Sequence, residues 1–285
     1  MTSAPLAQVI GDPIAQSKSP VIHGFWLEKL AVSGEYTAQL VKEGSVAEYL
    51  DNAKSVPHWR GCNVTMPHKH AALVAADRCD SIAKRIGAAN TIVREGDELV
   101  AYNTDAAGFL EPLRKDLETP HLFRMARILG TGGAARAIVT ALYDEGFTLV
   151  LAGRDPRKAR AMLDELAPKG EHHAVTLDHF SAPTDFAFDD RTGCFDVIVN
   201  ASPLGMAGQP PLAFDFTHAP PGSIVYDIVT SPVDTRFLQS AREAGLRTIN
   251  GLAMLIGQAA VAFEKFYDVQ PPRQFDGELM ECLQG

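Results

Sequence analysis

Four short clusters of polar residues occur within the first 105 residues, each where a predicted strand ends or the chain turns. They are Ser17-Lys18-Ser19-Pro20, Asn63-Val64-Thr65-Met66-Pro67-His68-Lys69, Ala88-Ala89-Asn90-Thr91 and Asn103-Thr104-Asp105. At such positions a ligand meets the side chains more readily than a core does, and lysine and aspartate can donate and accept protons. Each cluster alone also fits a local structural role: Ser19 before Pro20 suits a helix N-cap, and Asn or Asp is common in turns.

A glycine-rich segment, Gly130-Thr131-Gly132-Gly133-Ala134-Ala135, follows a predicted strand and opens a predicted helix. In this context Gly130 permits a tight turn, Gly132 lets a pyrophosphate approach the backbone, and Ala135 allows close packing of helix on strand. Amide groups at the helix start then face the anion. The segment predicts a dinucleotide site, with a packing turn in another α/β domain as the alternative.

The next strand ends in Ala152-Gly153-Arg154-Asp155-Pro156-Arg157-Lys158, where the adenosine ribose is normally recognised. An acidic side chain there accepts a hydrogen bond from a free 2′-hydroxyl, whereas arginine accommodates a 2′-phosphate. Three cations surround the single acid, so we expect NADP, but Asp155 leaves NAD possible. The alternative is that these charges belong to the solvated first turn of a helix.

Short apolar runs alternate with helical patterns from Arg127 to Ile249, which favours parallel strands joined by right-handed crossovers. The strands are expected at residues 127–130, 148–151, 173–177, 195–200, 224–227 and 247–249. Helices are expected at residues 134–145, 156–166 and 235–244. This part of the chain is predicted to be a doubly wound α/β domain.

The first hundred residues also alternate, with strands expected at residues 6–10, 36–40, 63–65 and 91–93. After Gly251 the apolar residues follow the spacing of a buried helical face, and a last helix is expected near residues 275–283. These helices are expected to return and cover the first domain. We therefore predict two domains, residues 1–106 with 252–285 and residues 107–251.

The composition excludes several classes of protein. The 285 residues are 46% hydrophobic and 21% charged, with 26 Lys+Arg against 35 Asp+Glu and a net charge of −9. This balance is typical of a folded domain and has the wrong sign for a nucleic-acid binder. The most apolar uncharged stretch has 16 residues, short of the roughly 20 of a membrane span, so no membrane partner is expected.

The amino end and the cysteines bear on compartment and metals. Asp12 and Lys18 interrupt any apolar signal core, so we expect a cytoplasmic protein. Four widely spaced cysteines predict neither a disulfide framework nor a zinc site, and are expected to be small buried residues. His172 and His173 are adjacent, so on a strand they face opposite sides and would not share a metal. No metal is expected.

Taken together and in order, these segments resemble the shikimate dehydrogenase family along nearly the whole chain. The matching motifs are Ser17-x-Ser19-Pro20, Asn63-Val64-Thr65-x-Pro67-His68-Lys69, Asn90-Thr91, Asn103-Thr104-Asp105, the glycine turn ending in Arg136, Asn200-Ala201-Ser202-Pro203-Leu204-Gly205-Met206, and Asn250-Gly251-Leu252-x-Met254-Leu255-x-x-Gln258-Ala259. The resemblance implies an α/β substrate domain closed by C-terminal helices and a Rossmann-like NADP domain. It also implies NADPH-dependent reduction of 3-dehydroshikimate to shikimate, in the pathway to aromatic amino acids.

The resemblance also implies roles for single residues. Lys69 and Asp105 would be the catalytic acid-base pair, and the substrate would be bound by Ser17, Ser19, Asn63, Thr65, Lys69, Asn90, Asp105, Gln258 and, in place of a usual tyrosine, Thr230. The cofactor would be bound by Gly130, Thr131, Gly132, Gly133, Ala134, Arg154, Asp155, Ala201, Ser202, Ile228, Gly251 and Met254. A cationic donor such as Lys69 stabilises the negative charge that develops on a ketone oxygen as hydride arrives. His68 is expected to support the site or lie on the surface, not to shuttle protons.

Three positions depart from the family pattern. Thr230 stands where a tyrosine usually reaches the substrate, Gly24 replaces an asparagine, and Gly153-Arg154-Asp155 replaces the common Asn-Arg-Thr. Two alternatives therefore stay open: a dehydrogenase of quinate or another cyclic polyol using NAD, and a non-catalytic metabolite sensor. Methylenetetrahydrofolate dehydrogenases share the two-domain plan, but the polar clusters do not suggest a pterin site. The assembly is expected to be a monomer or homodimer.

Overall fold

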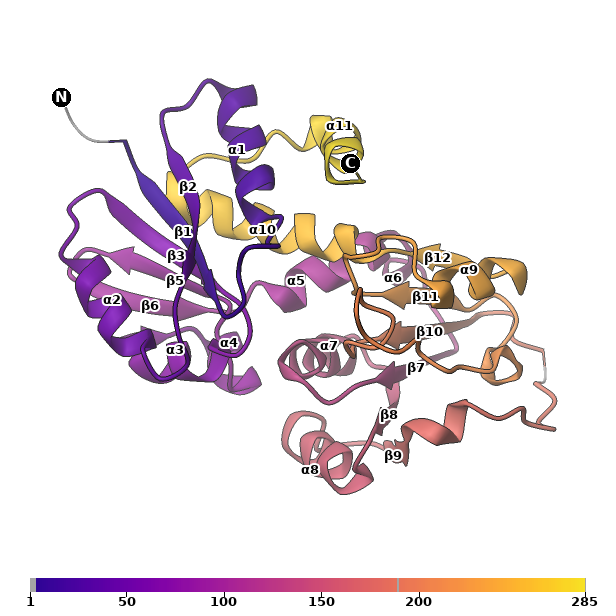
Figure 1. The fold of residues 1–285 in the computed structure, drawn as a ribbon. Helices are drawn as coiled ribbons and strands as arrows, with labels where there is room; N and C mark the ends of the chain where they lie inside the picture. Colours follow the sequence, from indigo (N-terminus) through magenta and orange to yellow (C-terminus); the bar gives the residue numbers. More distant parts are fainter. Residues whose placement is uncertain (1–3, 189, 285) are drawn as a thin grey trace. The chain divides into compact units, whose positions relative to one another are not determined.

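A computed structural model describes residues 4–188 and 190–284. The chain divides into two compact units, Met1–Asp105 with Ile256–Gly285, and Ala106–Leu255. Each unit is built on a six-stranded sheet of its own, within the described residues (Figure 1). The expected α/β class with two domains is confirmed. The assignment of substrate and cofactor to the two units stays a prediction.

The first unit holds a mixed sheet in the order β2-β1-β3-β5-β6-β4. Its strands are β1 (Leu6–Gly11), β2 (Glu35–Leu40), β3 (Trp59–Val64), β4 (Arg78–Cys79), β5 (Thr91–Glu95) and β6 (Glu98–Tyr102). The pairs of β1 with β2 and β3 are parallel, whereas β5 is antiparallel to both β3 and β6. Strand β6 is absent from the sequence prediction. Its signal is the Gly96-Asp97 pair, a two-residue hairpin turn in which Gly96 has a positive φ of 64°.

Helices cover both faces of the first sheet (Figure 1). They are α1 (Ser19–Leu30), α2 (Val46–Lys54), α3 (Lys69–Ala75), α4 (Ser81–Ile86) and α10 (Gly251–Tyr267), which starts in the second unit. The last helix, α11 (Asp276–Gln284), contacts α1. On one face, Val46 and Leu50 of α2 join the apolar core formed by β1, β3 and β5. On the other face, Trp26 of α1 packs edge-on against Phe263 of α10, with ring centroids 5.4 Å apart. The expected return of the C-terminal helices to the first domain is therefore observed.

The second unit holds an all-parallel sheet in the order β12-β11-β10-β7-β8-β9. Its elements are α5 (Asp105–Leu110), which begins at the last residue of the first unit's segment, α6 (Arg114–Leu117), β7 (Phe123–Leu129), α7 (Gly133–Asp144), β8 (Thr148–Gly153), α8 (Pro156–Leu166), β9 (His173–Thr176), β10 (Cys194–Asn200), β11 (Ile224–Asp227), α9 (Arg236–Glu243) and β12 (Arg247–Ile249). Counted along the chain, this is the Rossmann order 3-2-1-4-5-6, with its switch point between β7 and β10. The parallel doubly wound prediction is confirmed.

Two further sequence predictions differ from the structure. Strand β7 begins at Phe123, four residues before the predicted start at Arg127, and the charged Arg124 fits within the strand because its guanidinium donates to the carbonyls of Leu117 and Glu145. The cysteines are not uniformly buried: Cys62 is buried, Cys194 is partly buried, and Cys79 and Cys282 are exposed. Burial of all four is therefore a wrong prediction.

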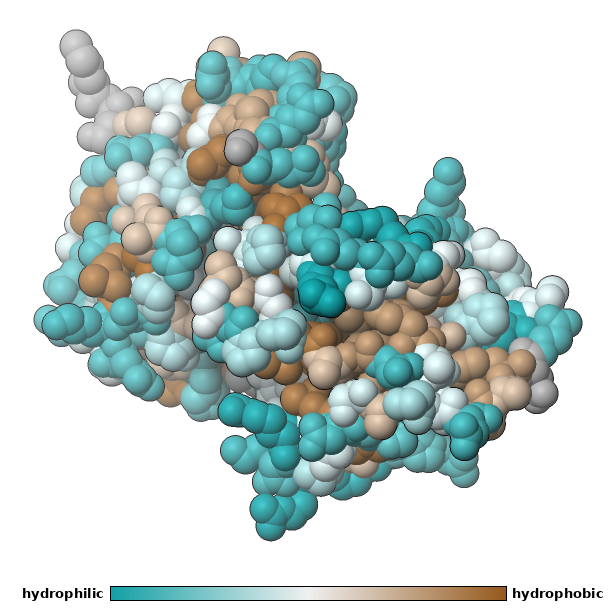
Figure 2. Space-filling model, turned by 45° about the vertical axis from the view of Figure 1, so that its right-hand side comes forward, coloured by the Kyte–Doolittle hydropathy of each residue, from teal (hydrophilic) through white to brown (hydrophobic). Residues whose placement is uncertain are grey.

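The surface carries many charged side chains. Hydrophilic residues cover much of the face drawn in Figure 2, and hydrophobic residues occupy smaller areas between them. Within residues 4–188 and 190–284, no helix combines the length and hydrophobicity that crossing a bilayer requires. In the same residues, His, Cys, Asp and Glu do not gather in groups of three that could hold a metal ion.

Candidate active site

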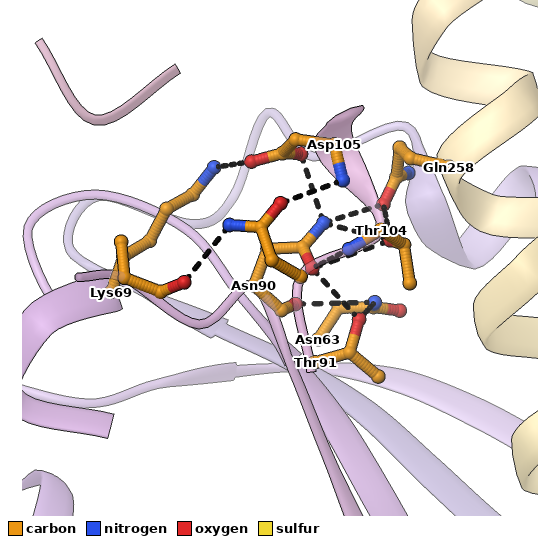
Figure 3. Close-up of polar contacts among 9 residues, drawn as sticks. Asn63, Lys69, Asn90, Thr91, Thr104, Asp105 and Gln258 are labelled. Carbon is orange, nitrogen blue, oxygen red and sulfur yellow. Dashed lines mark hydrogen bonds and ion pairs between the residues drawn. The ribbon is translucent and has the colours of Figure 1, made fainter. Parts of the chain in front are cut away.

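An ion pair lies at the centre of the polar clusters of the first unit. Lys69 is the first residue of α3 and Asp105 the first residue of α5, and Lys69 Nζ donates to Asp105 Oδ2 at 2.5 Å (Figure 3). Their side chains are 18% and 8% exposed. A charged pair so little exposed needs further hydrogen bonds to offset its desolvation.

Asn90 supplies those hydrogen bonds. Its Nδ2 donates to Asp105 Oδ1 at 2.8 Å and to Thr104 Oγ1 at 2.9 Å, and it lies 3.3 Å from Gln258 Oε1. Its Oδ1 accepts from the backbone N–H of Thr104 and the hydroxyl of Thr91. The Asn90 amide is thus fully used within the protein, and it fixes the orientation of the Asp105 carboxylate (Figure 3).

Asn63, at the end of β3, is held in a similar way. Its Nδ2 donates to Thr91 Oγ1 at 3.0 Å and to the carbonyl of Asn90 at 3.3 Å. Its Oδ1 accepts a hydrogen bond of 2.6 Å from the hydroxyl of Tyr36. The end of β3 and the start of β5 therefore place the side chains of Asn63 and Asn90 close together.

The loops after β1 and β3 approach each other closely. A Cβ atom on Gly11 would lie 2.4 Å from Thr65 Cγ2, so only glycine lets these two loops pack together here. Ser17 is partly exposed, and its Oγ accepts from the backbone N–H of Ser19 at 3.3 Å. The N-cap interpretation of Ser19 is wrong, because Lys18 occupies the N-cap position and Ser19 is the first residue of α1.

His68 precedes Lys69 in the chain but does not share its role. Its side chain is 1% exposed, and its Nε2 lies 2.7 Å from the carbonyl of Val41. This contact ties the start of α3 to the chain after β2. His68 is a supporting residue with no exposed ring to pass protons to solvent.

In the second unit, the glycine turn lies at the switch point of the parallel sheet. Gly130 has a φ of +125°, and a Cβ on it would lie 2.6 Å from the carbonyl oxygen of Ala201. The turn after β7 and the loop after β10 therefore touch through backbone atoms. By contrast, a Cβ on Gly132 would meet no atom within 4 Å, so internal packing does not require glycine there. Open space beside a helix start is what an approaching phosphate needs.

Helix α7 begins at Gly133 directly after this turn. Its N-cap, Gly132, has no side chain to satisfy the first N–H groups of the helix. Thr131 and Ala134 flank these glycines in the same turn. The 12-residue helix thus directs uncapped N–H groups and the positive end of its dipole toward the open space. The residues present fit a pyrophosphate.

The charged residues after β8 include an exposed arginine, Arg154, and an ion pair between Asp155 and Arg157. Arg154 is exposed and has no ion-pair partner among the residues that the structure describes. Asp155 is the N-cap of α8, accepting from the backbone N–H of Arg157 at 2.9 Å and from its guanidinium at 3.1 Å. These hydrogen bonds hold the pKa of Asp155 below its usual range. The Asp155 carboxylate is already paired with Arg157, so the positive charge of Arg154, unpaired within the described residues, favours binding of the additional 2′-phosphate.

The loops after β10 and β11 are fixed by two buried polar residues. Asn200 Nδ2 donates to Asp227 Oδ1 at 3.0 Å, and Asp227 Oδ2 accepts from the Thr235 hydroxyl at 2.6 Å. Burial raises the pKa of Asp227 to about 6, although its hydrogen bonds act in the opposite direction. The Ser202 hydroxyl donates to Asn200 Oδ1 at 2.7 Å, so this network also orients the predicted cofactor loop.

The remaining predicted cofactor residues lie around the end of β11 and the start of α10. The N–H of Ile228 donates to the carbonyl of Asn200 at 3.1 Å. A Cβ on Gly251 would lie 2.5 Å from the carbonyl oxygen of Ile228, which is too close. Internal packing is therefore sufficient to explain a glycine at this position. Met254 is buried, and Thr230 is partly buried in the segment after β11.

Comparison with known proteins identifies the family. Residues 9–92 match the model of the shikimate dehydrogenase substrate binding domain. The chain is 46% identical over 284 residues to the shikimate dehydrogenase (NADP(+)) of Sphingopyxis alaskensis, covering 99% of this chain and 97% of that protein. The chain belongs to the shikimate dehydrogenase family.

Solved structures of similar fold include more than one activity. Shikimate 5-dehydrogenase from Thermus thermophilus, in complex with NADP(H) and shikimate, is 32% identical with a TM-score of 0.80, covering 98% of this chain and 99% of that chain. The 5-ketofructose reductase of a Gluconobacter species is 27% identical with a TM-score of 0.82, covering 99% and 100%. The fold of the shikimate dehydrogenase family thus also carries a reductase of a different ketone.

Sequence reasoning missed two groups of supporting residues in this family member. Tyr36 and His23 lie outside the polar clusters, yet Tyr36 hydrogen-bonds Asn63 and His23 stacks on Tyr36. Asp227 and Thr235 hold the loop after β11. Only Asp227 carried a signal, since it is an acid directly after an apolar strand.

Proposed function

We propose that this protein catalyses the reversible reduction of 3-dehydroshikimate to shikimate with NADPH, a step in the biosynthesis of chorismate and aromatic amino acids. Membership of the shikimate dehydrogenase family supports this proposal, with a 46% identical relative of that name. The observation that carries it is the Lys69–Asp105 pair, oriented by Asn90 within a cluster of hydroxyl and amide groups. A metabolite sensor needs the binding groups but not this pair.

Lys69 is the proposed acid. As hydride reaches the ketone carbon, charge builds on the oxygen, and an ammonium N–H directed at it stabilises the transition state more than the ground state. Lys69 then gives its proton to the oxygen, and in the reverse direction it takes the proton from the alcohol. Asp105 holds the ammonium in position through Oδ2 while Asn90 holds Oδ1.

The other substrate contacts follow from the placement of each side chain. Ser17, in the loop after β1, and Ser19, the first residue of α1, are proposed to bind the carboxylate. The ring hydroxyls are proposed to be bound, directly or through a neighbouring side chain, by Asn63, Thr65, Asn90, Asp105 and Gln258. Thr230 is proposed to take the position of the family's tyrosine. Because Asn90 uses its whole amide internally, we propose that it acts through Asp105.

The second unit is proposed to bind NADP. The uncapped start of α7, the open space at Gly132 and the close packing of Gly130 on Ala201 support a pyrophosphate site. Arg154 is proposed to bind the 2′-phosphate, with Thr131, Gly133, Ala134 and Asp155 close by. The nicotinamide site is proposed to be lined by Ala201, Ser202, Ile228, Gly251 and Met254. When bound, NADPH supplies the hydride.

The test is an absorbance assay at the nicotinamide band, crossing shikimate and quinate with NADP and NAD. We expect turnover with shikimate and NADP, and we expect Lys69→Ala to lower kcat by about 100-fold or more while leaving cofactor affinity unchanged. Absence of turnover with every pair, or full activity of the Lys69→Ala variant, would contradict the proposal.

One observation favours a second candidate substrate. Thr230 replaces the family's tyrosine with a shorter hydroxyl, and a structural neighbour of 27% identity is a 5-ketofructose reductase. The alternative is a dehydrogenase of quinate or another cyclic polyol, using NADP or NAD. Higher kcat/KM for quinate than for shikimate in the same assay would establish it.

The location and the assembly of the protein are proposals as well. We propose a cytoplasmic protein, in keeping with the NADPH-dependent biosynthetic step proposed above, and a monomer or homodimer. Light scattering coupled to gel filtration would distinguish these two assemblies.

A further inference from the structure

Tyr36 lies outside every polar motif, yet its side chain hydrogen-bonds a residue of one of them. It belongs to β2, its side chain is buried, and its hydroxyl donates to Asn63 Oδ1 at 2.6 Å. One phenol on β2 therefore holds the amide side chain at the end of β3.

The hydrogen bonds from Tyr36 continue in one direction toward the ion pair. Asn63 Nδ2 donates to Thr91 Oγ1 at 3.0 Å, and the Thr91 hydroxyl donates to Asn90 Oδ1 at 3.1 Å. Asn90 Nδ2 then donates to Asp105 Oδ1 at 2.8 Å. Each donor faces the next acceptor, and the series ends on a carboxylate. Buried series of this kind are cooperative, because each bond polarises the next.

His23 fixes the ring of Tyr36. The two rings are stacked with centroids 3.9 Å apart and an angle of 6° between their planes. His23 is fully buried on α1, and burial lowers its pKa to about 3, so the ring is neutral at pH 7. A neutral, flat ring in this place leaves the phenol little freedom to turn away from Asn63.

We propose that Tyr36 is a positioning residue of the substrate site, whose hydroxyl holds the Asn63 amide in place and starts the series of hydrogen bonds that orients Asp105. The role follows from what its removal leaves behind. Without the hydroxyl, Asn63 Oδ1 is a buried acceptor that has lost its donor, and the side chain gains by turning elsewhere. This inference rests on the proposed function only in naming the substrate.

The test compares Tyr36→Phe with a matched control, Tyr49→Phe. Tyr49 is a partly buried tyrosine of the same unit whose hydroxyl donates to Gln8 Oε1 at 2.8 Å. This hydrogen bond is not part of the series that leads to Asp105. Each variant loses one hydroxyl and one hydrogen bond. We expect Y36F to raise the KM for shikimate by about tenfold, the effect of losing one internal hydrogen bond, with the KM for NADP unchanged. Y49F leaves both values unchanged.

A second readout does not depend on catalysis. The side-chain NH₂ signals of Asn63, assigned by their loss in an Asn63→Asp variant, shift in ¹⁵N NMR spectra of the ligand-free Y36F protein and not in those of Y49F. An unchanged Asn63 signal, or equal rises of KM in both variants, overturns the role of Tyr36. A failure of the proposed function is distinguishable from a failure of this inference. In the first case the wild-type protein would not turn over shikimate, and the NMR comparison would still test whether Tyr36 positions Asn63.

Discussion

Separating the structural role of the Lys69–Asp105 pair from its proposed catalytic role is the most direct test of the site. Lys69→Met removes the ammonium and leaves the Asp105 carboxylate, 8% exposed, without its cation. Breaking a fully buried pair in this way costs about 3–5 kcal/mol. Because Lys69 is 18% exposed and water can partly replace it, we expect a loss at or below the lower end of this range, about 2–3 kcal/mol.

Asp105→Asn is the complementary change, since the amide keeps the shape of the side chain and can still accept from Asn90. We expect it to cost about 1 kcal/mol, because the flexible ammonium that remains can reach water. The double variant K69M/D105N contains no buried charge at this position. The double-mutant cycle should therefore show a coupling of about 1–2 kcal/mol, with part of the stability lost in K69M recovered.

Both tryptophans of the protein, Trp26 and Trp59, are buried in the first unit. Urea unfolding followed by tryptophan fluorescence therefore reports the stability of the unit that holds the pair. Turnover is measured in parallel. We expect kcat to fall by about 100-fold or more in K69M and not to recover in the double variant. Recovery of turnover together with stability would refute the acid-base role, and unchanged stability in K69M would refute the burial argument.

Four further outcomes follow from the structure. Arg154→Gln should raise the KM for NADP by about tenfold or more, the effect of losing a charged hydrogen-bond donor, and leave the KM for NAD unchanged in steady-state assays. Thr230→Tyr, which restores the family's phenol, should lower the KM for shikimate about fivefold, and an unchanged KM would exclude this position from substrate binding. Burial lowers the pKa of His23 to about 3, so its contribution to stability is complete above pH 6.5 and falls by about 1.4 kcal/mol per pH unit below that value. The His23→Phe variant should lose this dependence in tryptophan-monitored unfolding between pH 6.5 and 4. The pH dependence of stability that Asp227 causes has the opposite sign. Burial raises its pKa to about 6, so its contribution to the free energy of unfolding is complete below about pH 4 and is lost as the pH rises through 6. Unfolding of Asp227→Asn, followed by circular dichroism, should lack that loss, and an equal loss in the variant would contradict the assignment.

The fold of the second unit was predictable because local pattern and tertiary structure agree there. Short apolar strands and intervening helices admit only parallel pairing with right-handed crossovers, and Gly130 marks the turn at the switch point. The start of β7 was missed, since the sequence around Arg124 does not reveal that the carbonyls of Leu117 and Glu145 accept hydrogen bonds from its guanidinium. Such partners for a charged side chain are a property of the folded chain.

The first unit was less predictable. Its mixed sheet depends on the hairpin at Gly96-Asp97, a two-residue signal, and its helices carry few distinctive caps. The polar motifs supplied Lys69, Asn90 and Asp105 as candidates, and the structure brings these three together. Tyr36 could not be found from the sequence, because a tyrosine on a strand between polar neighbours does not show which acceptor its hydroxyl will reach.

The hydrogen bonds also decide which candidates can face a ligand, something that motifs cannot do. Lys69 has three N–H donors, of which the described residues take one, at Asp105. Asp105 has one hydrogen bond on each side-chain oxygen and so retains lone pairs on both. Asn90 has neither donors nor acceptors to spare. A ligand at this site therefore meets a paired donor and acceptor from Lys69 and Asp105. That pairing suits a carbon whose oxygen alternates between ketone, which only accepts hydrogen bonds, and alcohol, which also donates them.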